Sequence, residues 1–268
     1  MFYNAKNETI TLHNKTFDTI RFGNGKKVLI IIPGVGDGLK TVKGLSLPFA
    51  YLYRLFTKEY TVYSFSRTNE LTQGYTTEQM ADDLKELLDF FHLEEVDVVG
   101  VSQGGMIAQW LAIKYPTYVH KLVLVVTSSR PNLFIDQKIH EWIDYAKNND
   151  YKQLMLDTTL ASYSDSYIQR MKVFLPLLTI FGKPKSFDCF VIQAESCLSH
   201  NTYHQLKMIQ CPTLIIGGKQ DKIVGVNASI ELAKKILNSE LYLYEEYGHA
   251  LYDEAKDFNQ RVVNFLYK

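Results

Sequence analysis

Residues 95–108 read EVDVVGVSQGGMIA and change character halfway along. The first half is rich in valine, and such a run is typical of a strand that is buried on both faces of a parallel sheet. The second half opens a helix near Met106, and the pentapeptide GVSQG lies between the two at residues 100–104. A G-x-S-x-G pattern between strand and helix predicts a sharp turn that holds Ser102 in a strained conformation above the sheet. The pattern also fits a plain glycine-rich turn whose serine caps the helix.

Buried strands and helices alternate along most of the chain. Strand-like segments occur at residues 28–32, 61–65, 122–126, 213–217 and 241–245, and helix-like segments occur at 49–57, 80–91, 227–237 and 254–267. An alternating polar and apolar segment at residues 8–22, with a turn at Asn14-Lys15, predicts an antiparallel hairpin ahead of them. Together these patterns predict an α/β protein with a mainly parallel, doubly wound sheet of eight strands and helices on both faces.

The alternation stops between residues 129 and 206. This part of the chain has only helix-like stretches, at residues 134–148, 151–160, 164–179 and 186–200, separated by Asp150, Gly182 and Pro184. The strand pattern resumes afterwards, so both ends of the segment belong to the sheet. We therefore expect one sheet domain, formed by residues 1–128 and 207–268, with residues 129–206 as an all-helical insertion.

Composition excludes several classes of function. The chain is 46% hydrophobic, which is ample for a core, and its 29 basic and 29 acidic residues cancel, so nothing favours binding to nucleic acid or anionic lipid. No run is as long as a membrane span, and the N-terminus does not resemble a signal sequence. Cys189, Cys197 and Cys211 lack metal-binding spacing. We expect a cytoplasmic monomer or homodimer with free thiols, no metal or cofactor, and a small molecule as its substrate.

The candidate chemistry depends on residues that follow strands. A serine hydroxyl needs a base to act as a nucleophile, and the base needs a group that orients it. Working residues in open α/β sheets gather at the carboxyl ends of the strands. Asp221 follows the strand at 213–217, and His249 follows the strand at 241–245. The order Ser102, Asp221, His249 is the order of a catalytic triad on such a sheet.

Each residue also has a plainer interpretation. Asp221 alone fits a turn or helix cap, and His249 alone, beside a glycine, fits an exposed loop. Asp97 and Asp253 fit structural positions. The other histidines lie in a hairpin turn, at helix ends or within the insertion, so none follows a strand: His13, His92, His120, His140, His200 and His204. The coincidence of three residues in the right order favours a triad over three unrelated structural roles.

A glycine-rich loop, PGVGDG at residues 33–38, follows the strand at 28–32. Such a loop favours a turn that presents backbone N–H groups to an anion. An ordinary strand exit fits the same residues. A phosphate-binding loop fits poorly, because no Lys-Ser or Lys-Thr pair follows.

These motifs together resemble the α/β-hydrolase superfamily, with residues 129–206 as a helical cap after the sixth strand. The resemblance implies that Ser102 is the nucleophile, that His249 is the general base and then the general acid, and that Asp221 orients the imidazole. It also implies an oxyanion hole formed by the backbone N–H groups of Val35 and Gln103. The implied activity is that of a serine esterase.

Two features depart from the common family pattern. Pro33-Gly34 stands where the family usually has His-Gly, and the segment Asp-x-Arg-Gly-x-Gly-x-Ser is reduced to Ser66-Arg67 followed by residues 68–70. The second departure makes prolyl aminopeptidase-like enzymes poor guides. Serine instead of aspartate at position 102 argues against haloalkane dehalogenases and epoxide hydrolases.

The substrate is less defined than the mechanism. Aromatic residues of the insertion would suit an apolar acyl or aryl group, although they also fit simple helix packing: Phe134, Trp142, Tyr145, Tyr163, Phe174, Phe181 and Phe187. We expect a small to medium carboxylic ester. The same scaffold leaves open a carbon–carbon bond hydrolase, a lyase, an acyltransferase or a non-catalytic ligand-binding protein.

Overall fold

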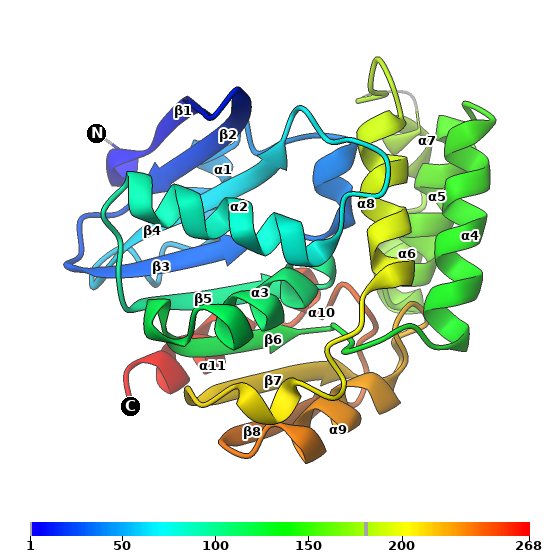
Figure 1. Cartoon of the computed structure of the whole chain (residues 1–268). Helices are drawn as coiled ribbons and strands as arrows, with labels where there is room; N and C mark the ends of the chain where they lie inside the picture. The colour runs from blue at the N-terminus through cyan, green and yellow to red at the C-terminus, as the bar shows by residue number, and fades with distance from the viewer. Residues whose placement is uncertain (1, 180–181) are drawn as a thin grey trace.

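One sheet organises the computed structural model, which describes residues 2–179 and 182–268. Within those residues the sheet has eight strands in the order β1-β2-β4-β3-β5-β6-β7-β8 (Figure 1). The strands are β1 (Lys6–Leu12), β2 (Lys15–Phe22), β3 (Lys27–Ile32), β4 (Tyr60–Thr68), β5 (Val96–Val101), β6 (Val119–Val125), β7 (Thr213–Gly218) and β8 (Ser239–Tyr244). Strands β3 to β8 pair in parallel with one another, whereas β2 pairs antiparallel with both β1 and β4. The predicted mainly parallel, eight-stranded sheet is confirmed.

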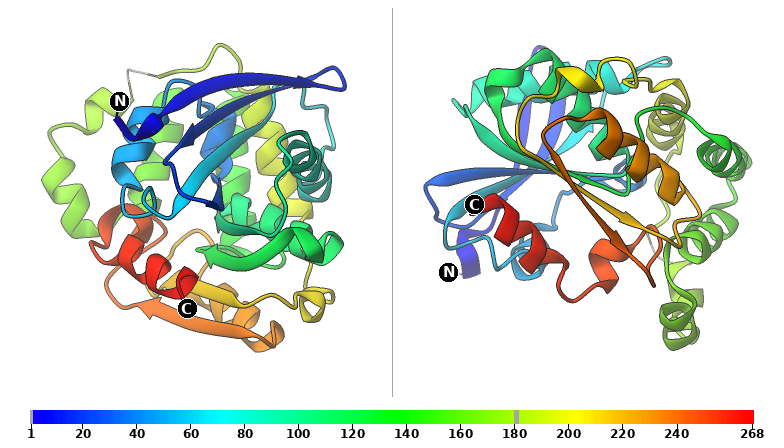
Figure 2. Two further views of the ribbon diagram at one scale, coloured as in Figure 1. Left: turned by 90° about the vertical axis from the view of Figure 1, so that its left-hand side faces the viewer. Right: turned by 90° about the horizontal axis from the view of Figure 1, so that it is seen from below.

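Helices cover both faces of the sheet because its central strands are apolar on both sides. In β3, Ile30 and Ile32 are buried in one core cluster, while Leu29 and Ile31 are buried in another. The first cluster lies under α2 (Thr77–Phe90), α3 (Gln103–Lys114) and α9 (Val226–Lys235), and the second lies under α1 (Ser46–Leu52), α10 (Leu251–Glu254) and α11 (Phe258–Leu266). Figure 2 shows these two helical layers from the side and from below. Short 3₁₀ turns are η1 (Phe2–Asn4), η2 (Val35–Gly38), η3 (Pro116–Tyr118) and η4 (Leu206–Met208).

The segment between β6 and η4 folds as helices that gather beyond the carboxyl ends of the strands (Figure 1). They are α4 (Leu133–Lys147), α5 (Tyr151–Ser162), α6 (Asp165–Met171), α7 (Leu175–Leu178) and α8 (Asp188–Ser199). We call residues 129–206 the helical insertion. Its core cluster is built around Ile139, Trp142 and Phe190, and residues outside the insertion, among them Met106 and Ile223, also belong to it.

Several predicted boundaries are wrong for local reasons. The first hairpin turns at His13-Asn14, both with positive φ, so Lys15 already belongs to β2. The stretch 164–179 is two helices, because Pro176 is tolerated only in the first turn of a new helix. The stretch 254–267 is also interrupted, and α1 begins earlier than residues 49–57 suggested.

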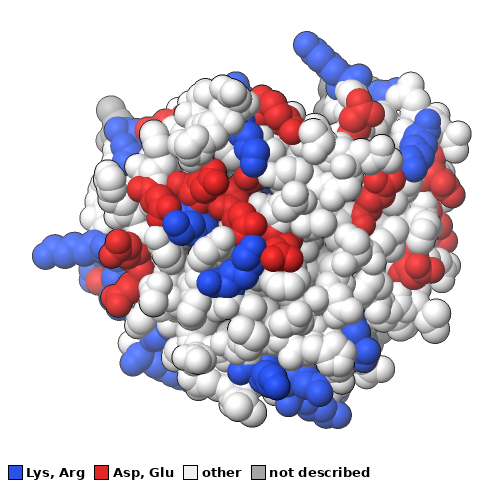
Figure 3. All heavy atoms as spheres, viewed as in Figure 1, with Lys and Arg blue, Asp and Glu red and all other residues white. Residues whose placement is uncertain are grey.

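Charges of opposite sign lie side by side on the face shown in Figure 3. On α2 and α3, Lys114 pairs with Glu78 and Asp82, and Lys85 pairs with Asp89. In these pairs two lysines face three carboxylates. None of the described helices is long and apolar enough to cross a bilayer.

His200 follows α8 and provides a test of acid stability. Burial lowers its pKa to about 3, and its Nδ1 atom lies 2.9 Å from Thr77 Oγ1. Between that pKa and the ordinary value of 6.5, the unfolded chain takes up a proton that the folded chain does not. The contribution of His200 to folding stability is therefore fully present above the unfolded pKa. Below that pKa it falls with decreasing pH, by about 1.4 kcal/mol per pH unit.

We expect His200→Gln to remove this pH dependence while retaining a polar contact with Thr77. Urea unfolding from pH 6.5 to pH 5 should show a loss of stability smaller in the variant than in the wild type by about 1.6 kcal/mol. Parallel curves for the two proteins would contradict the buried, neutral state of this imidazole.

Candidate active site

Ser102 occupies the turn that joins β5 directly to α3. Its φ of 54° and ψ of −119° lie in a region that residues with a side chain rarely adopt. Its N–H donates to the Val125 carbonyl over 2.9 Å, and its own carbonyl accepts a hydrogen bond of 2.7 Å from the Thr127 hydroxyl. Strand β6 and the residues after it therefore hold the strained turn in place.

The turn also requires a close approach at Gly104. A Cβ atom there would lie 2.1 Å from the Ile32 carbonyl oxygen and 2.7 Å from that of Pro33. Both contacts are with backbone at the end of β3, which cannot rotate away. The N-terminus of α3 thus lies directly against the start of the 33–38 loop.

We expect Gly104→Ala to destabilise the protein by about 3 kcal/mol, because a well-packed backbone must move to accommodate the methyl group. Urea unfolding measures the change. Gly36→Ala is the matched control, since a Cβ atom there would meet nothing described within 4 Å. Equal stabilities of the two variants would show that the close approach at Gly104 is absent in solution.

The structure brings Ser102, His249 and Asp221 together. The Ser102 Oγ atom lies 3.0 Å from His249 Nε2, and His249 Nδ1 lies 2.9 Å from Asp221 Oδ2. The Ser102 side chain caps no N–H group of α3 among the described residues, so the capping interpretation fails. His249 and Asp221 are each only 6% exposed, so the histidine is not a surface residue.

The Asp221 side chain stabilises the turn after β7 and also contacts His249. Its Oδ1 atom accepts hydrogen bonds from the N–H groups of Ile223 (2.8 Å) and Val224 (3.0 Å). Burial acts to raise the pKa of Asp221, but the electrostatic interaction and hydrogen bond with His249, together with the two backbone hydrogen bonds, outweigh it, and the pKa lies below its ordinary value. The side chain is therefore a fixed carboxylate, with one oxygen for the loop and one for the imidazole.

The two segments with the expected oxyanion donors both lie against Ser102. Gln103 is the first residue of α3, where a backbone N–H has no acceptor within the helix. Val35 opens η2, and the Gly34 position before it is so close to Ser102 that an added Cβ would lie 3.3 Å from the serine Cβ. The 33–38 loop and the start of α3 therefore both lie beside the serine.

The sequence did not reveal what supports the 33–38 loop. Arg67, at the end of β4, is buried, and its Nη2 atom donates to the Pro33 carbonyl over 2.5 Å. Asp37 accepts a 3.0 Å hydrogen bond from the Arg67 N–H. Burial lowers the pKa of Arg67 and raises that of Asp37, and each charge partly offsets the effect on the other. The Ser66-Arg67 remnant of the family segment was the available signal for this support.

The aromatic residues of the insertion differ in their exposure. Trp142 and Phe187 are buried in its core cluster, and Trp142 Nε1 donates to Asp157 over 2.8 Å. Phe134 and Phe174 are half exposed, and Phe181 lies outside the described residues. Trp142 and Phe187 therefore pack the insertion. Among the described residues, no cluster of His, Cys, Asp or Glu has the arrangement of a metal site.

Comparisons with known proteins agree with this architecture. The putative carbamate hydrolase RutD of Caulobacter sp. (strain K31) is 28% identical to this chain, over 73% of this chain and 74% of its own. A 2-hydroxy-6-oxononadienedioate/2-hydroxy-6-oxononatrienedioate hydrolase of Pseudomonas sp. is 24% identical, over 91% and 89%. The crystal structure of the enol-lactonase of Burkholderia xenovorans LB400 superposes with a TM-score of 0.82, at 17% identity over 97% and 100% of the two chains. The family model for the alpha/beta hydrolase fold matches residues 28–256, and the chain belongs to the α/β-hydrolase family.

Proposed function

We propose that this protein is a serine hydrolase that cleaves a small to medium, mostly apolar carboxylic ester. The observation that carries the proposal is the continuous contact from Ser102 Oγ through the buried imidazole of His249 to the Asp221 carboxylate, with separations of 3.0 and 2.9 Å. A binding protein has no need for this combination of hydroxyl, base and orienting carboxylate. The family and its hydrolytic members support the same conclusion.

In the proposed mechanism, His249 Nε2 accepts the proton of Ser102 as Oγ attacks the ester carbonyl carbon. The Asp221 carboxylate keeps the other ring nitrogen protonated and stabilises the imidazolium that forms. The N–H groups of Val35 and Gln103 donate to the oxyanion of the tetrahedral intermediate. The imidazolium then protonates the leaving alcohol, and water, activated by the same imidazole, hydrolyses the acyl-enzyme to release the acid and restore Ser102.

We further propose that the helical insertion acts as a cap over this site. Val35 beside the serine, and Ile223 and Val224 beyond Asp221, pack into the insertion's core cluster. Met106 of α3 packs there as well. A substrate that reaches Ser102 beneath the insertion would therefore meet mainly apolar side chains, which favours an apolar acyl group.

The second candidate is a carbon–carbon bond hydrolase that uses the same residues. The specific support is the Pseudomonas relative, a 2-hydroxy-6-oxononadienedioate/2-hydroxy-6-oxononatrienedioate hydrolase whose similarity covers 91% of this chain. Such a substrate carries two carboxylates. An uncharged ester suits the apolar surroundings of Val35 and Ile223 better, and for that reason we rank the esterase first.

The test is a direct comparison of substrates with purified protein. The p-nitrophenyl esters of acetate, butyrate and octanoate are assayed beside a 2-hydroxy-6-oxo dienoate, and products are identified by mass spectrometry. We expect turnover of the shorter esters and covalent capture of Ser102 by a fluorophosphonate probe. Cleavage of the dienoate alone would replace the esterase by the second candidate, and absence of both turnover and probe labelling would reject a hydrolase.

A further inference from the structure

The side chain of Gln103 links the catalytic turn to the helical insertion. Gln103 follows Ser102 directly and is fully buried. Its Oε1 atom accepts a 2.8 Å hydrogen bond from Arg67 Nη2. Its Nε2 atom donates to the Gln193 carbonyl (2.6 Å) and to Ser196 Oγ (3.0 Å), both on α8. One amide group is thus held between the sheet and the insertion.

The same guanidinium nitrogen contacts the other side of the site. Arg67 Nη2 donates to the Pro33 carbonyl as well as to Gln103, and the Arg67 N–H donates to Asp37. Pro33 and Asp37 lie two residues before and two residues after Val35. Arg67 therefore fixes both segments that carry the proposed oxyanion donors.

Helix α8 also contacts the 33–38 loop directly. A Cβ atom on Gly38 would lie 2.6 Å from Phe190 Cα, so the backbone of η2 packs against the backbone of α8. A shift of α8 would consequently act on both segments, on η2 through this contact and on the start of α3 through the Gln103 amide.

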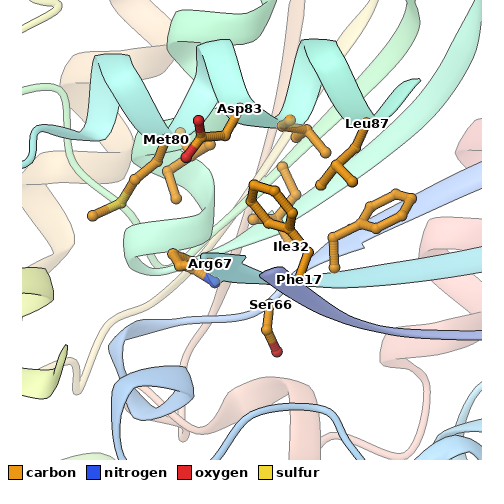
Figure 4. A pocket seen from close by; sticks show the side chains of 10 residues that line it. Phe17, Ile32, Ser66, Arg67, Met80, Asp83 and Leu87 are labelled. Atoms are coloured by element: carbon orange, nitrogen blue, oxygen red, sulfur yellow. The ribbon is translucent and has the colours of Figure 1, made fainter. Parts of the chain in front are cut away.

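Two charged side chains, Arg67 and Asp37, are buried in this arrangement. Arg67 Nη1 lies 3.9 Å from Asp37 Oδ2, and both side chains are at most 3% exposed. Arg67 lines a cavity of about 20 Å³ between α2 and the sheet, with Ile32 and Phe17 (Figure 4), enough for a single water molecule. Replacing a buried ion pair by apolar residues is often neutral or stabilising, so stability alone does not explain the burial of Arg67 and Asp37.

We propose that Gln103 is a positioning residue that couples α8 to the oxyanion hole, so that the placement of the insertion sets how strongly the two N–H groups bind the oxyanion. The inference rests on the proposed function. It predicts that breaking the link to α8 lowers kcat while substrate binding in the ground state is little changed.

Gln103→Glu tests the link because it keeps the contact with Arg67 and removes the hydrogen bonds to α8. A carboxylate still accepts from Arg67, but it has no N–H for Gln193 or Ser196. We expect kcat for a p-nitrophenyl ester to fall about 10- to 100-fold, with KM changed less than about threefold, because a misplaced oxyanion donor loses part of the 10²- to 10³-fold effect of a complete deletion. Ser196→Ala, a milder change at the far end of the same contact, should lower kcat in the same direction.

A trifluoromethyl ketone provides a second readout. Its adduct with Ser102 carries an oxyanion, so its inhibition constant should rise by the same factor as kcat falls. The product carboxylic acid carries no tetrahedral oxyanion, and its affinity should stay near that of the wild type.

Gln109→Leu is the matched control. Gln109 lies on the same helix, is equally buried, and bonds to Gly105, Ser128 and Thr202 without contacting Arg67 or the 33–38 loop. The Gln109→Leu variant should be less thermally stable than the wild type, with kcat within about threefold of the wild-type value. An equal fall of kcat in Gln109→Leu, or unchanged kcat and ketone inhibition in both Gln103→Glu and Ser196→Ala, would overturn the coupling. Full activity of Ser102→Ala would instead overturn the proposed function itself.

Discussion

Ser102→Ala is expected to lower kcat for ester hydrolysis by about 10⁴-fold or more and to leave the fold unchanged. The substitution removes the oxygen that lies 3.0 Å from His249 Nε2, and with it the atom that would form the acyl-enzyme. The backbone contacts that hold the turn, from the Ser102 N–H to Val125 and from Thr127 to the Ser102 carbonyl, do not involve this oxygen. Steady-state hydrolysis of p-nitrophenyl butyrate, with circular dichroism and thermal unfolding, measures both parts of the expectation.

Ser128→Ala is the matched control for this experiment. Ser128 is a buried serine that follows β6, and its hydroxyl donates to the Arg130 carbonyl rather than to His249. Removal of this hydroxyl should leave kcat within about threefold of the wild-type value. Near-wild-type turnover by Ser102→Ala would mean that another group attacks the ester, and the proposed mechanism would then be wrong.

The sheet could be predicted from sequence because its signals are local. Residues 98–101 and 28–32 are apolar on both faces, as is typical of strands that helices cover on both sides of a sheet. The same reasoning placed Asp221 and His249 after neighbouring strands, and β7 and β8 do pair in parallel. A carboxylate and an imidazole at adjacent strand ends need little more than this topology to meet.

The network around Arg67 could not be predicted in this way. The strand expected at residues 61–65 in fact continues to Thr68, which pairs with Phe17 of β2. Burial of Arg67 depends on partners from segments far apart in the chain, among them Gln103 and Pro33. No periodicity in the sequence marks such contacts, because each partner contributes a single atom. The unexpected part of the site is therefore the part built from isolated polar contacts across several elements.

Asp221→Asn is expected to lower kcat by about 10⁴-fold with little change in KM or stability. The amide oxygen can still accept from the N–H groups of Ile223 and Val224, so the turn after β7 is retained. The amide NH₂ then faces His249 Nδ1, which must become an acceptor. The ring proton moves to Nε2, and that nitrogen can no longer take the proton of Ser102. The loss of kcat therefore results from the wrong tautomer of His249 and not from a change in the fold.

Asp221→Ala separates the two functions of this side chain. It removes the acceptor for Ile223 and Val224 as well as the carboxylate that faces His249, so stability should fall by about 1–2 kcal/mol in urea unfolding while kcat falls as in the asparagine variant. An asparagine variant that keeps kcat within tenfold would show that the imidazole needs no carboxylate to hold its proton on Nδ1. The contact of 2.9 Å between His249 and Asp221 would then be purely structural, and the general base would act without an orienting partner.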